Sequence, residues 1–281
     1  AGHPSASIDI SSAIMNDKAS NPSDTPASNF VRIEAAALSS LARRLDHSML
    51  APFTAASDLL IHAADNRRSV IATGIGKSGI IARKIAATLR STGTPAHFLH
   101  PAEALHGDLG MIAHGDTVLA LSSSGETEEI LNLLPTLKNF AAKLIGFCSC
   151  PTSTLAQASD IFLDTSVDAE ACPLHLAPTA STTVMLALGD ALALEVSRRR
   201  GWKAEDFADL HPGGRLGKRL ARVRDLMHSG DALPGVAPNT PLPQVIHEMS
   251  HKQLGMTTVL KGNFLLGMIS DGDLRRLLER D

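Results

Sequence analysis

The sequence lacks an uninterrupted apolar run of the roughly 18 to 20 residues that a membrane span requires. Its first residues also lack the basic start and the apolar stretch of a signal peptide. We therefore expect a cytoplasmic protein that has no membrane as a partner.

Cysteine and excess positive charge are also scarce. The three cysteines, Cys148, Cys150 and Cys172, cannot pair completely, so free thiols in a reducing compartment are expected. The first two could form half of a metal site, but the sequence has no second pair. A formal net charge of −3 at pH 7 suggests no basic face for a polyanion, so nucleic acid is not expected as a partner.

Apolar residues make up 44% of the 281 positions, which suffices for a packed core in a chain long enough for two domains. Residues 1–29 are rich in Ser, Ala, Asn, Asp and Pro, and we expect them to form a disordered tail. From Phe30 onward apolar residues recur at helical spacing, and a second helix is predicted over 51–65.

A regular alternation of strands and helices follows. Short apolar runs, each followed by a turn and a helical pattern, predict strands over 69–73, 95–99, 117–122, 143–147 and 160–163. This alternation is typical of an α/β fold with a doubly wound parallel sheet that helices cover on both faces. In such sheets ligands bind beyond the carboxyl ends of the strands.

A long helix over 179–200 and a short one over 202–210 are predicted to close this domain. Basic residues then lead into short elements separated by Gly and Pro. We expect a first domain over 30–216, a linker over 217–224 and a small α+β domain over 225–281.

The first candidate motif is Gly-Ile-Gly-Lys-Ser-Gly at 74–79, between the first predicted strand and a helix. Its spacing matches a dinucleotide site, but the next strand ends Phe-Leu-His at 98–100, without the acidic residue that a nicotinamide cofactor needs. A P-loop would need glycine at position 71, which is isoleucine. The remaining interpretation is a helix N-terminus with Lys77, suited to a small anion.

The second motif follows the third strand, where Ser122, Ser123, Ser124 and Thr127 surround a glycine. Hydroxyls at a helix N-terminus can donate to one phosphate together with the backbone N–H groups. A serine-rich helix cap is the simpler interpretation of one such loop alone. Two such loops after neighbouring parallel strands predict a cleft for a phosphorylated small molecule.

Histidines and glutamates supply the candidate acid-base groups. His97, His100, His106 and His114 could bind a transition metal, although their spacing matches no fixed ligand motif. Loop histidines are more often hydrogen-bonded polar residues.

Glu129, Glu170 and His211 stand in or after loops that should meet at one sheet edge. Glu170 has Ala, Cys and Pro as neighbours, which we expect to raise its pKa toward that of a general base. For a single glutamate, a solvated surface position remains the simpler interpretation.

Six segments together resemble the sugar isomerase (SIS) domain of the bacterial arabinose-5-phosphate isomerase family. They are 74–79 (GIGKSG), 91–95 (STGTP), 100–111 (HPAEALHGDLGM), 122–129 (SSSGETEE), 170–183 (EACPLHLAPTASTT) and 211–214 (HPGG). The EACPL, Ala-Pro-Thr and HPGG patterns are more specific than a glycine loop. Downstream, 225–228, 255–257 and 267–274 resemble one CBS repeat, whereas full-length family members carry two.

The resemblance implies an aldose-ketose isomerase that interconverts D-ribulose 5-phosphate and D-arabinose 5-phosphate through an enediol. Its product would lead to 3-deoxy-D-manno-octulosonate for lipopolysaccharide or capsule. No cofactor would be required. The catalytic positions of the family correspond to Lys77, Glu129, Glu170 and His211. Among the two glutamates, we expect Glu170 to be the base.

The expected substrate contacts are Gly93, Thr94, His100, His106, Ser122, Ser123, Ser124 and Thr127. The resemblance also makes His100 a zinc position, and it implies a homotetramer in which His211 reaches the site of a neighbouring subunit. A nucleotide or nucleotide sugar is the expected regulator at the CBS repeat.

Two alternatives stay open at this point. SIS domains also occur in transcription regulators, so the protein could be a non-catalytic sugar-phosphate sensor. Such regulators usually carry a helix-turn-helix before the SIS domain, and no basic recognition helix precedes it here. An isomerase of another phosphosugar, such as a hexulose phosphate, is not excluded by the residues alone.

Overall fold

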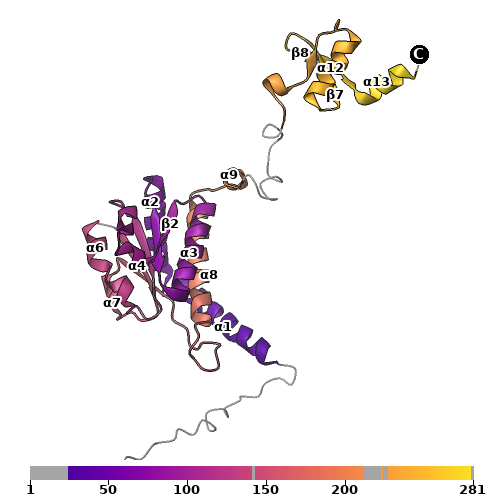
Figure 1. The fold of residues 1–281 in the computed structure, drawn as a ribbon. Coiled ribbons are helices and arrows are strands. Elements are labelled where there is room, and N and C mark those ends of the chain that lie inside the picture. The colour runs from indigo at the N-terminus through magenta and orange to yellow at the C-terminus, as the bar shows by residue number, and fades with distance from the viewer. Residues whose placement is uncertain (1–24, 141–142, 212–222, 224–226, 280–281) are drawn as a thin grey trace, which may run out of the picture. The chain divides into compact units, whose positions relative to one another are not determined.

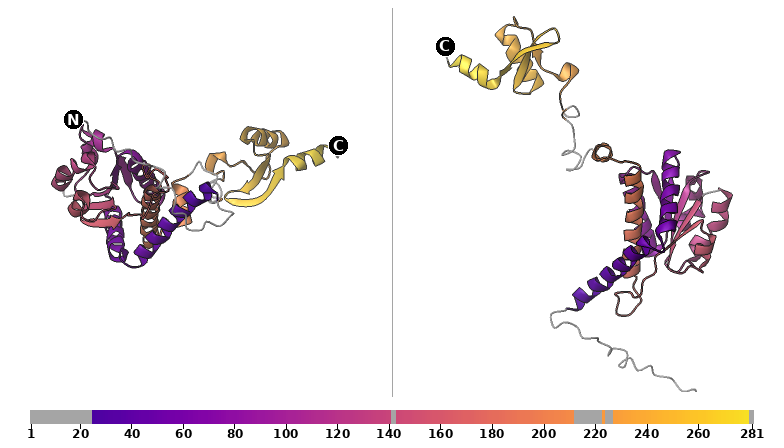
Figure 2. Two further views of the ribbon diagram at one scale, coloured as in Figure 1. Left: turned by 90° about the horizontal axis from the view of Figure 1, so that it is seen from below. Right: turned by 180° about the vertical axis from the view of Figure 1, so that it is seen from behind.

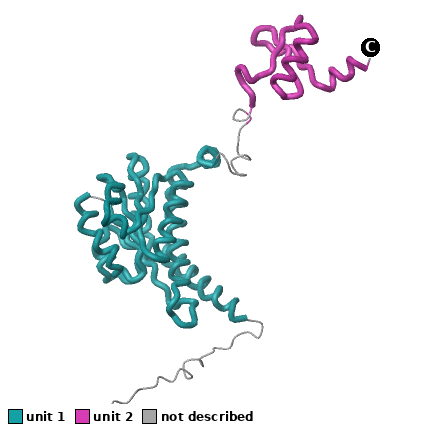
Figure 3. Tube along the Cα trace, in the orientation of Figure 1, with its two compact units in different colours: residues 1–211 teal, residues 212–281 magenta. Residues whose placement is uncertain are grey.

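The computed structural model describes residues 25–140, 143–211, 223 and 227–279. The chain divides into two compact units, Ala1–His211 and Pro212–Asp281 (Figure 3). Of the linker expected over 217–224, only Val223 lies within the described residues. The first 24 residues of the expected tail also lie outside them.

Two helices open unit 1. Helix α1 (Pro26–Asp46) begins within the expected tail, because Thr25 Oγ1 accepts the N–H of Ser28 at 3.2 Å and proline occupies the first helical position. Residues 26–29 therefore belong to the helix, which corrects the predicted boundary. Figures 1 and 2 show the first half of α1 projecting beyond the rest of the unit. Helix α2 (Leu50–Asp65) agrees closely with its prediction.

The predicted doubly wound sheet is confirmed. Its strands are β1 (Val70–Gly74), β2 (Ala96–Leu99), β3 (Thr117–Leu121), β4 (Lys143–Cys148) and β5 (Ile161–Asp164). All neighbours pair in parallel, in the order β2-β1-β3-β4-β5. Every residue of β1 and β3 is buried, as expected for central strands covered on both faces.

Helices cover both faces of the sheet (Figure 1). On one face lie α1, α2, α3 (Gly76–Ser91) and α8 (Ala180–Arg199), and on the other lie α4 (Pro101–Ala104), α5 (Glu128–Leu131), α6 (Leu134–Asn139) and α7 (Thr154–Ala158). A 3₁₀ helix (Asp108–Met111) and the short helix α9 (Ala204–Asp209) complete the unit. Because strand side chains alternate, the two faces carry two separate apolar clusters.

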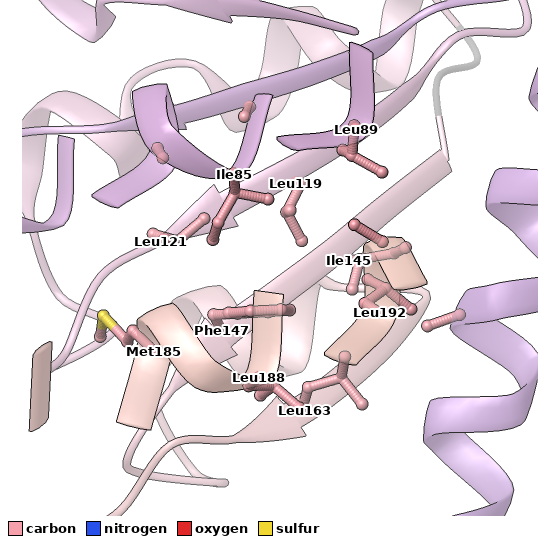
Figure 4. Close-up of a cluster of buried hydrophobic side chains, with 14 of the residues drawn as sticks. Ile85, Leu89, Leu119, Leu121, Ile145, Phe147, Leu163, Met185, Leu188 and Leu192 are labelled. Atoms are coloured by element: carbon pink, nitrogen blue, oxygen red, sulfur yellow. The ribbon is translucent and has the colours of Figure 1, made fainter. Parts of the chain in front are cut away.

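The larger cluster fixes the two longest helices of the site against the sheet (Figure 4). Side chains of α3 and α8 meet strand residues there: Ile85, Leu89, Met185, Leu188, Leu192, Leu119, Leu121, Ile145, Phe147 and Leu163. Among the described helices, α8 alone is long and apolar enough to cross a membrane by length and composition, yet half of it is buried inside the fold. Its packing is that of a core helix.

Unit 2 is much smaller. A 3₁₀ helix (Gly230–Ala232) is followed by β6 (Gly235–Val236), α12 (Leu242–Lys252), β7 (Met256–Lys261), β8 (Phe264–Ser270) and α13 (Asp271–Leu278). Strand β7 pairs in parallel with β6 and antiparallel with β8. The buried core consists of Val236, Val245 and Met249.

Candidate functional site

The order of the strands creates a crevice between β1 and β3, because the chain leaves these neighbours in opposite directions along the sheet. The loops that follow both strands line a pocket of about 480 Å³. It is lined by Ile75, Lys77, Ser78, Ser123, Ser124, Thr127, Ser149, Pro178, Ser181, Thr182 and Met185. Most of these side chains carry hydroxyls, one is cationic and none is acidic, so the pocket suits an anion.

The first contribution to the pocket is the N-terminus of α3. Glycine at 79 lets this helix approach β1 closely, since a Cβ there would lie 2.6 Å from the carbonyl oxygen of Gly74. The glycine motif thus serves helix-strand packing. Lys77 stands in the first turn of the helix with an exposed side chain, where the positive end of the helix dipole also favours an anion.

The serine loop forms the second wall. Ser123, Ser124 and Thr127 line the pocket. Ser122 does not, because it is buried and its Oγ lies 2.7 Å from Thr127 Oγ1 while accepting the N–H of Gly125 at 3.1 Å. Its hydroxyl shapes the loop, and its expected role as a substrate contact stays a prediction. The following helix, α5, has only four residues, so its dipole adds less than the prediction assumed.

The third wall is the N-terminus of α8, which the prediction of individual site residues missed. Ser181, Thr182 and Met185 come from its first turns, and Pro178 from the loop before it. The signal was present as a run of hydroxyl residues at the start of the predicted helix over 179–200. Ser78 and Ser149 were also missed, since a single serine after a strand carries no distinctive pattern.

Glu170 is not among the residues that line the pocket. Its Oε2 accepts hydrogen bonds from Thr179 N at 2.7 Å, Thr179 Oγ1 at 2.9 Å and Ser181 N at 3.3 Å. Desolvation raises the pKa of this carboxyl, but the hydrogen bonds from Ser181 and Thr179 outweigh it and hold the pKa below its ordinary value. The expectation of a raised pKa is therefore wrong.

The other acid-base candidates on this edge lie near the pocket lining without belonging to it. Glu129 is partly buried in α5, two residues after Thr127. His100 directly follows Leu99, which pairs with Thr73 of β1, and its Nδ1 accepts the N–H of Ala102 at 3.3 Å. It thereby caps α4.

His106 is exposed after α4. In the part of the chain that the structure describes, no group of three or more His, Cys, Asp or Glu side chains is placed to hold a metal ion. Because Nδ1 of His100 accepts the N–H of Ala102, only its Nε2 remains to bind a metal, and the described residues supply no three-ligand group around it.

Two expected substrate contacts lie at the opposite edge of the sheet. Gly93 and Thr94 connect α3 to the amino end of β2. A Cβ at Gly93 would lie 2.3 Å from the Trp202 ring, and Arg200 Nη1 donates to the Gly93 carbonyl at 2.7 Å. The Thr94 side chain is 1% exposed, and its buried hydroxyl has no partner among the described residues. The Thr94 side chain is thus closed off from solvent in this structure, and its role as a substrate contact stays a prediction.

His211 follows α9, far from the pocket of its own chain. Figure 1 shows α9 beyond the C-terminal end of α8, whose N-terminus lines the pocket, and a helix of 20 residues is about 30 Å long. The imidazole stacks on Phe207 with ring centroids 4.0 Å apart. Its Nδ1–H donates to the Phe207 carbonyl at 2.8 Å, which leaves Nε2 with the free lone pair in the neutral ring.

Comparison with known proteins places this arrangement in a family. The model of the SIS domain matches residues 64–195. Arabinose 5-phosphate isomerase KdsD of Pseudomonas aeruginosa is 51% identical over 256 residues, which cover 90% of this chain and 76% of the relative. The chain belongs to the arabinose 5-phosphate isomerase family. The resemblance inferred from the six sequence segments is therefore confirmed.

Further arabinose 5-phosphate isomerases are similarly close. KdsD of Escherichia coli strain K12 is 50% identical over 212 residues, which cover 75% of this chain and 65% of the relative. The chain thus spans about two thirds to three quarters of the length of these relatives.

Solved structures agree with this family. A protein of E. coli CFT073, solved in complex with arabinose 5-phosphate, has a TM-score of 0.61 and 42% identity, covering 66% of this chain and 95% of its own. A phosphosugar isomerase involved in capsule formation from Bacteroides fragilis has a TM-score of 0.62 and 36% identity, covering 67% and 96%. Both are similar to unit 1 in length, so they support the SIS fold of that unit.

Proposed function

We propose that this protein is a cytoplasmic aldose-ketose isomerase that interconverts D-ribulose 5-phosphate and D-arabinose 5-phosphate. The observation that carries the proposal is the hydroxyl-lined pocket with Lys77 at the switch point of the sheet, in a chain about 50% identical to arabinose 5-phosphate isomerases. The relative solved with arabinose 5-phosphate supports the substrate class. The product would supply 3-deoxy-D-manno-octulosonate for lipopolysaccharide or capsule.

The phosphate group binds between Ser123, Ser124 and Thr127 on one side and the N-termini of α3 and α8 on the other. Three features support this placement: the density of hydroxyl donors, the positive ends of two long helices and the absence of acidic residues from the lining. The sugar then extends toward Lys77.

The chemistry requires moving a hydrogen between C1 and C2 through an enediol. Lys77 stabilises the negative charge that develops on the enediolate oxygens, because an ammonium group at a helix N-terminus is already oriented toward an anion. A carboxylate removes the proton from one carbon and returns it to the neighbouring carbon, while a second proton passes from the hydroxyl oxygen to the carbonyl oxygen of the pair. The family resemblance makes Glu129 and Glu170 the two candidates for this step, of which one is the base.

From a neighbouring subunit of a homotetramer, His211 opens the furanose ring of arabinose 5-phosphate or moves the proton between the two oxygens. Its Nε2 can exchange a proton with a sugar oxygen, because Nδ1–H is held by the Phe207 carbonyl. The length of α8 between the pocket and α9 supports a composite site, since His211 stands at the far end of this helix from its own pocket.

Residues 225–281 form a CBS repeat that binds a nucleotide or nucleotide-sugar regulator. A pocket of about 340 Å³ supports this proposal, lined by Ile246, Met249, Ser250, Gln253, Gly255, Asp271 and Leu274. Titrating AMP and a nucleotide sugar into the protein by calorimetry tests it, with Asp271→Asn as the comparison. If neither compound releases heat with the wild-type protein, these nucleotide classes are rejected.

The enzymatic proposal is tested by incubating the purified protein with ribulose 5-phosphate and following the products by NMR. Arabinose 5-phosphate is the expected product, with solvent deuterium at C2. Tight binding of the sugar phosphate without conversion would favour the non-catalytic sensor. Conversion of a hexulose phosphate in a parallel sample, with ribulose 5-phosphate untouched, would favour an isomerase of another phosphosugar.

A further inference from the structure

The carboxylate of Glu170 joins the two ends of the segment that leads into α8. Its Oε2 accepts from Thr179 N at 2.7 Å, Thr179 Oγ1 at 2.9 Å and Ser181 N at 3.3 Å. In return, Thr179 Oγ1 accepts the N–H of Ala171 at 2.8 Å. We call this set of hydrogen bonds the clasp, because it closes the segment from 170 to 181 into a loop.

The clasp ends directly at the pocket. The residues on either side of Thr179 line the pocket: Pro178 before it, and Ser181 and Thr182 after it. The first N–H groups of a helix have no partner within the helix, so they adopt a fixed direction only when an outside group accepts from them. Here Glu170 accepts from the N–H of Thr179 and of Ser181, and its negative charge also complements the N-terminal end of α8.

We propose that Glu170 contributes to the isomerisation as a positioning residue, whose clasp holds the α8 wall of the pocket in place for the sugar phosphate. The inference rests on the isomerase function proposed above. It leaves proton abstraction to another group, and Glu129 is the family's remaining carboxylate, two residues beyond Thr127 of the phosphate loop.

The convergence of three donors on one oxygen argues against proton transfer by Glu170. A carboxylate that accepts several hydrogen bonds is stabilised in its charged form, so it binds a proton weakly. Protonation of Oε1 would also neutralise the group and weaken the hydrogen bonds to Oε2. A general base works best when its pKa lies near the working pH, and the clasp moves the pKa of Glu170 away from that range.

The geometry separates the two roles in one experiment. Because all three donors meet a single oxygen, the amide oxygen of Glu170→Gln can replace Oε2, whereas the variant cannot act as a base. We expect Glu170→Gln to keep kcat within about fivefold of wild type and Glu170→Ala to raise KM for ribulose 5-phosphate about tenfold or more, the scale of lost hydrogen bonds. A loss of about 10²- to 10⁴-fold in kcat for Glu170→Gln, with KM unchanged, would overturn the proposal.

Thr179 offers a second pair of variants that keeps the test decisive if Glu170→Ala does not fold. Thr179→Val removes the hydroxyl of the clasp but keeps the shape of the side chain, and Thr179→Ser restores the hydroxyl. We expect KM to rise about three- to tenfold in the valine variant, with kcat retained, and to recover in the serine variant. An unchanged KM in the valine variant would count against the clasp. Thermal unfolding verifies that each variant is folded.

Binding measurements distinguish failure of the clasp from failure of the isomerase function. If wild type does not convert ribulose 5-phosphate, the enzymatic proposal fails, and calorimetry with arabinose 5-phosphate still tests the clasp. The expected order of affinity is wild type close to Glu170→Gln, and both tighter than folded Glu170→Ala or Thr179→Val. Equal affinity of all four proteins would reject the clasp.

Discussion

At the carboxyl edge of the unit 1 sheet, three chain segments leave a pocket open between them, whereas at the amino edge the chain is packed tightly around Trp202. Ser124 and Thr127 line the pocket at the first edge, while the Thr94 hydroxyl at the second is sealed inside the fold. His211 follows α9 on the side of the second edge. Residues that we assign to one reaction thus lie at opposite edges of the sheet in a single chain. A site shared between subunits would need this arrangement.

Removing the ammonium group of Lys77 from the pocket at the carboxyl edge should have the largest effect on kcat. Lys77→Met deletes the ammonium group from the pocket but keeps a long side chain, so it should lower kcat about 10²- to 10³-fold, with a small change in KM. Lys84→Met, on the same helix, is a matched control that breaks only an exposed ion pair with Asp190 and should leave kcat nearly unchanged. Steady-state kinetics with ribulose 5-phosphate measures both, and equal kcat values would remove Lys77 from the chemistry.

Mixing two inactive variants tests whether the two edges come from different chains. Cells that express Lys77→Met and His211→Ala together should yield mixed oligomers in which some sites combine an intact Lys77 with an intact His211. Random assembly gives recovery of about a quarter of wild-type activity. Co-expression of Lys77→Met with Lys77→Ala is the control and should recover none. Equally low activity in both mixtures would place His211 outside a shared site.

The central strands β1 and β3 were predictable because they are buried on both faces and so appear as short, continuous apolar runs, and the other strands repeat the same spacing of run, turn and helix. Each begins within one residue of its prediction. The loop at 122–127 was recognisable for a similar reason, since its hydroxyls are adjacent in sequence. The N-terminal boundary was wrong because the composition of the tail concealed a local signal, the Thr25 cap followed by Pro26.

Contacts between residues that are distant in the sequence could not be predicted from sequence patterns. The apolar neighbours of Glu170 suggested a raised pKa, but its environment is set by donors from Thr179 and Ser181, nine and eleven residues away. The predicted strand over 95–99 already placed Gly93 and Thr94 at its amino end, away from the edge where ligands were expected. The close packing of Trp202 against Gly93, in contrast, could not be predicted from the sequence.

Loss of a single hydroxyl from the pocket at the carboxyl edge should reduce activity less than loss of the Lys77 ammonium group. Ser124→Ala and Thr127→Ala each remove one donor from the phosphate site that we propose, and the phosphate does not react, so KM should rise about three- to tenfold while kcat changes less. Thr54→Ala is the control, since its exposed hydroxyl bonds only to the Leu50 carbonyl in α2. An unchanged KM for both pocket variants would move the phosphate away from this loop.

Metal removal should have the smallest effect on turnover. An aldose-ketose exchange can proceed by proton transfer alone, and His100 Nδ1 caps α4 in a chain whose described residues offer no three-ligand metal group. Dialysis against a chelator should leave kcat within about twofold, and His100→Asn, which keeps a capping side chain, should lose any zinc that the wild type binds without losing the fold. Metal analysis alongside kinetics measures both effects. Activity that is abolished by the chelator and restored by one metal would contradict this expectation. His100 would then need further metal ligands from outside the described residues of one chain.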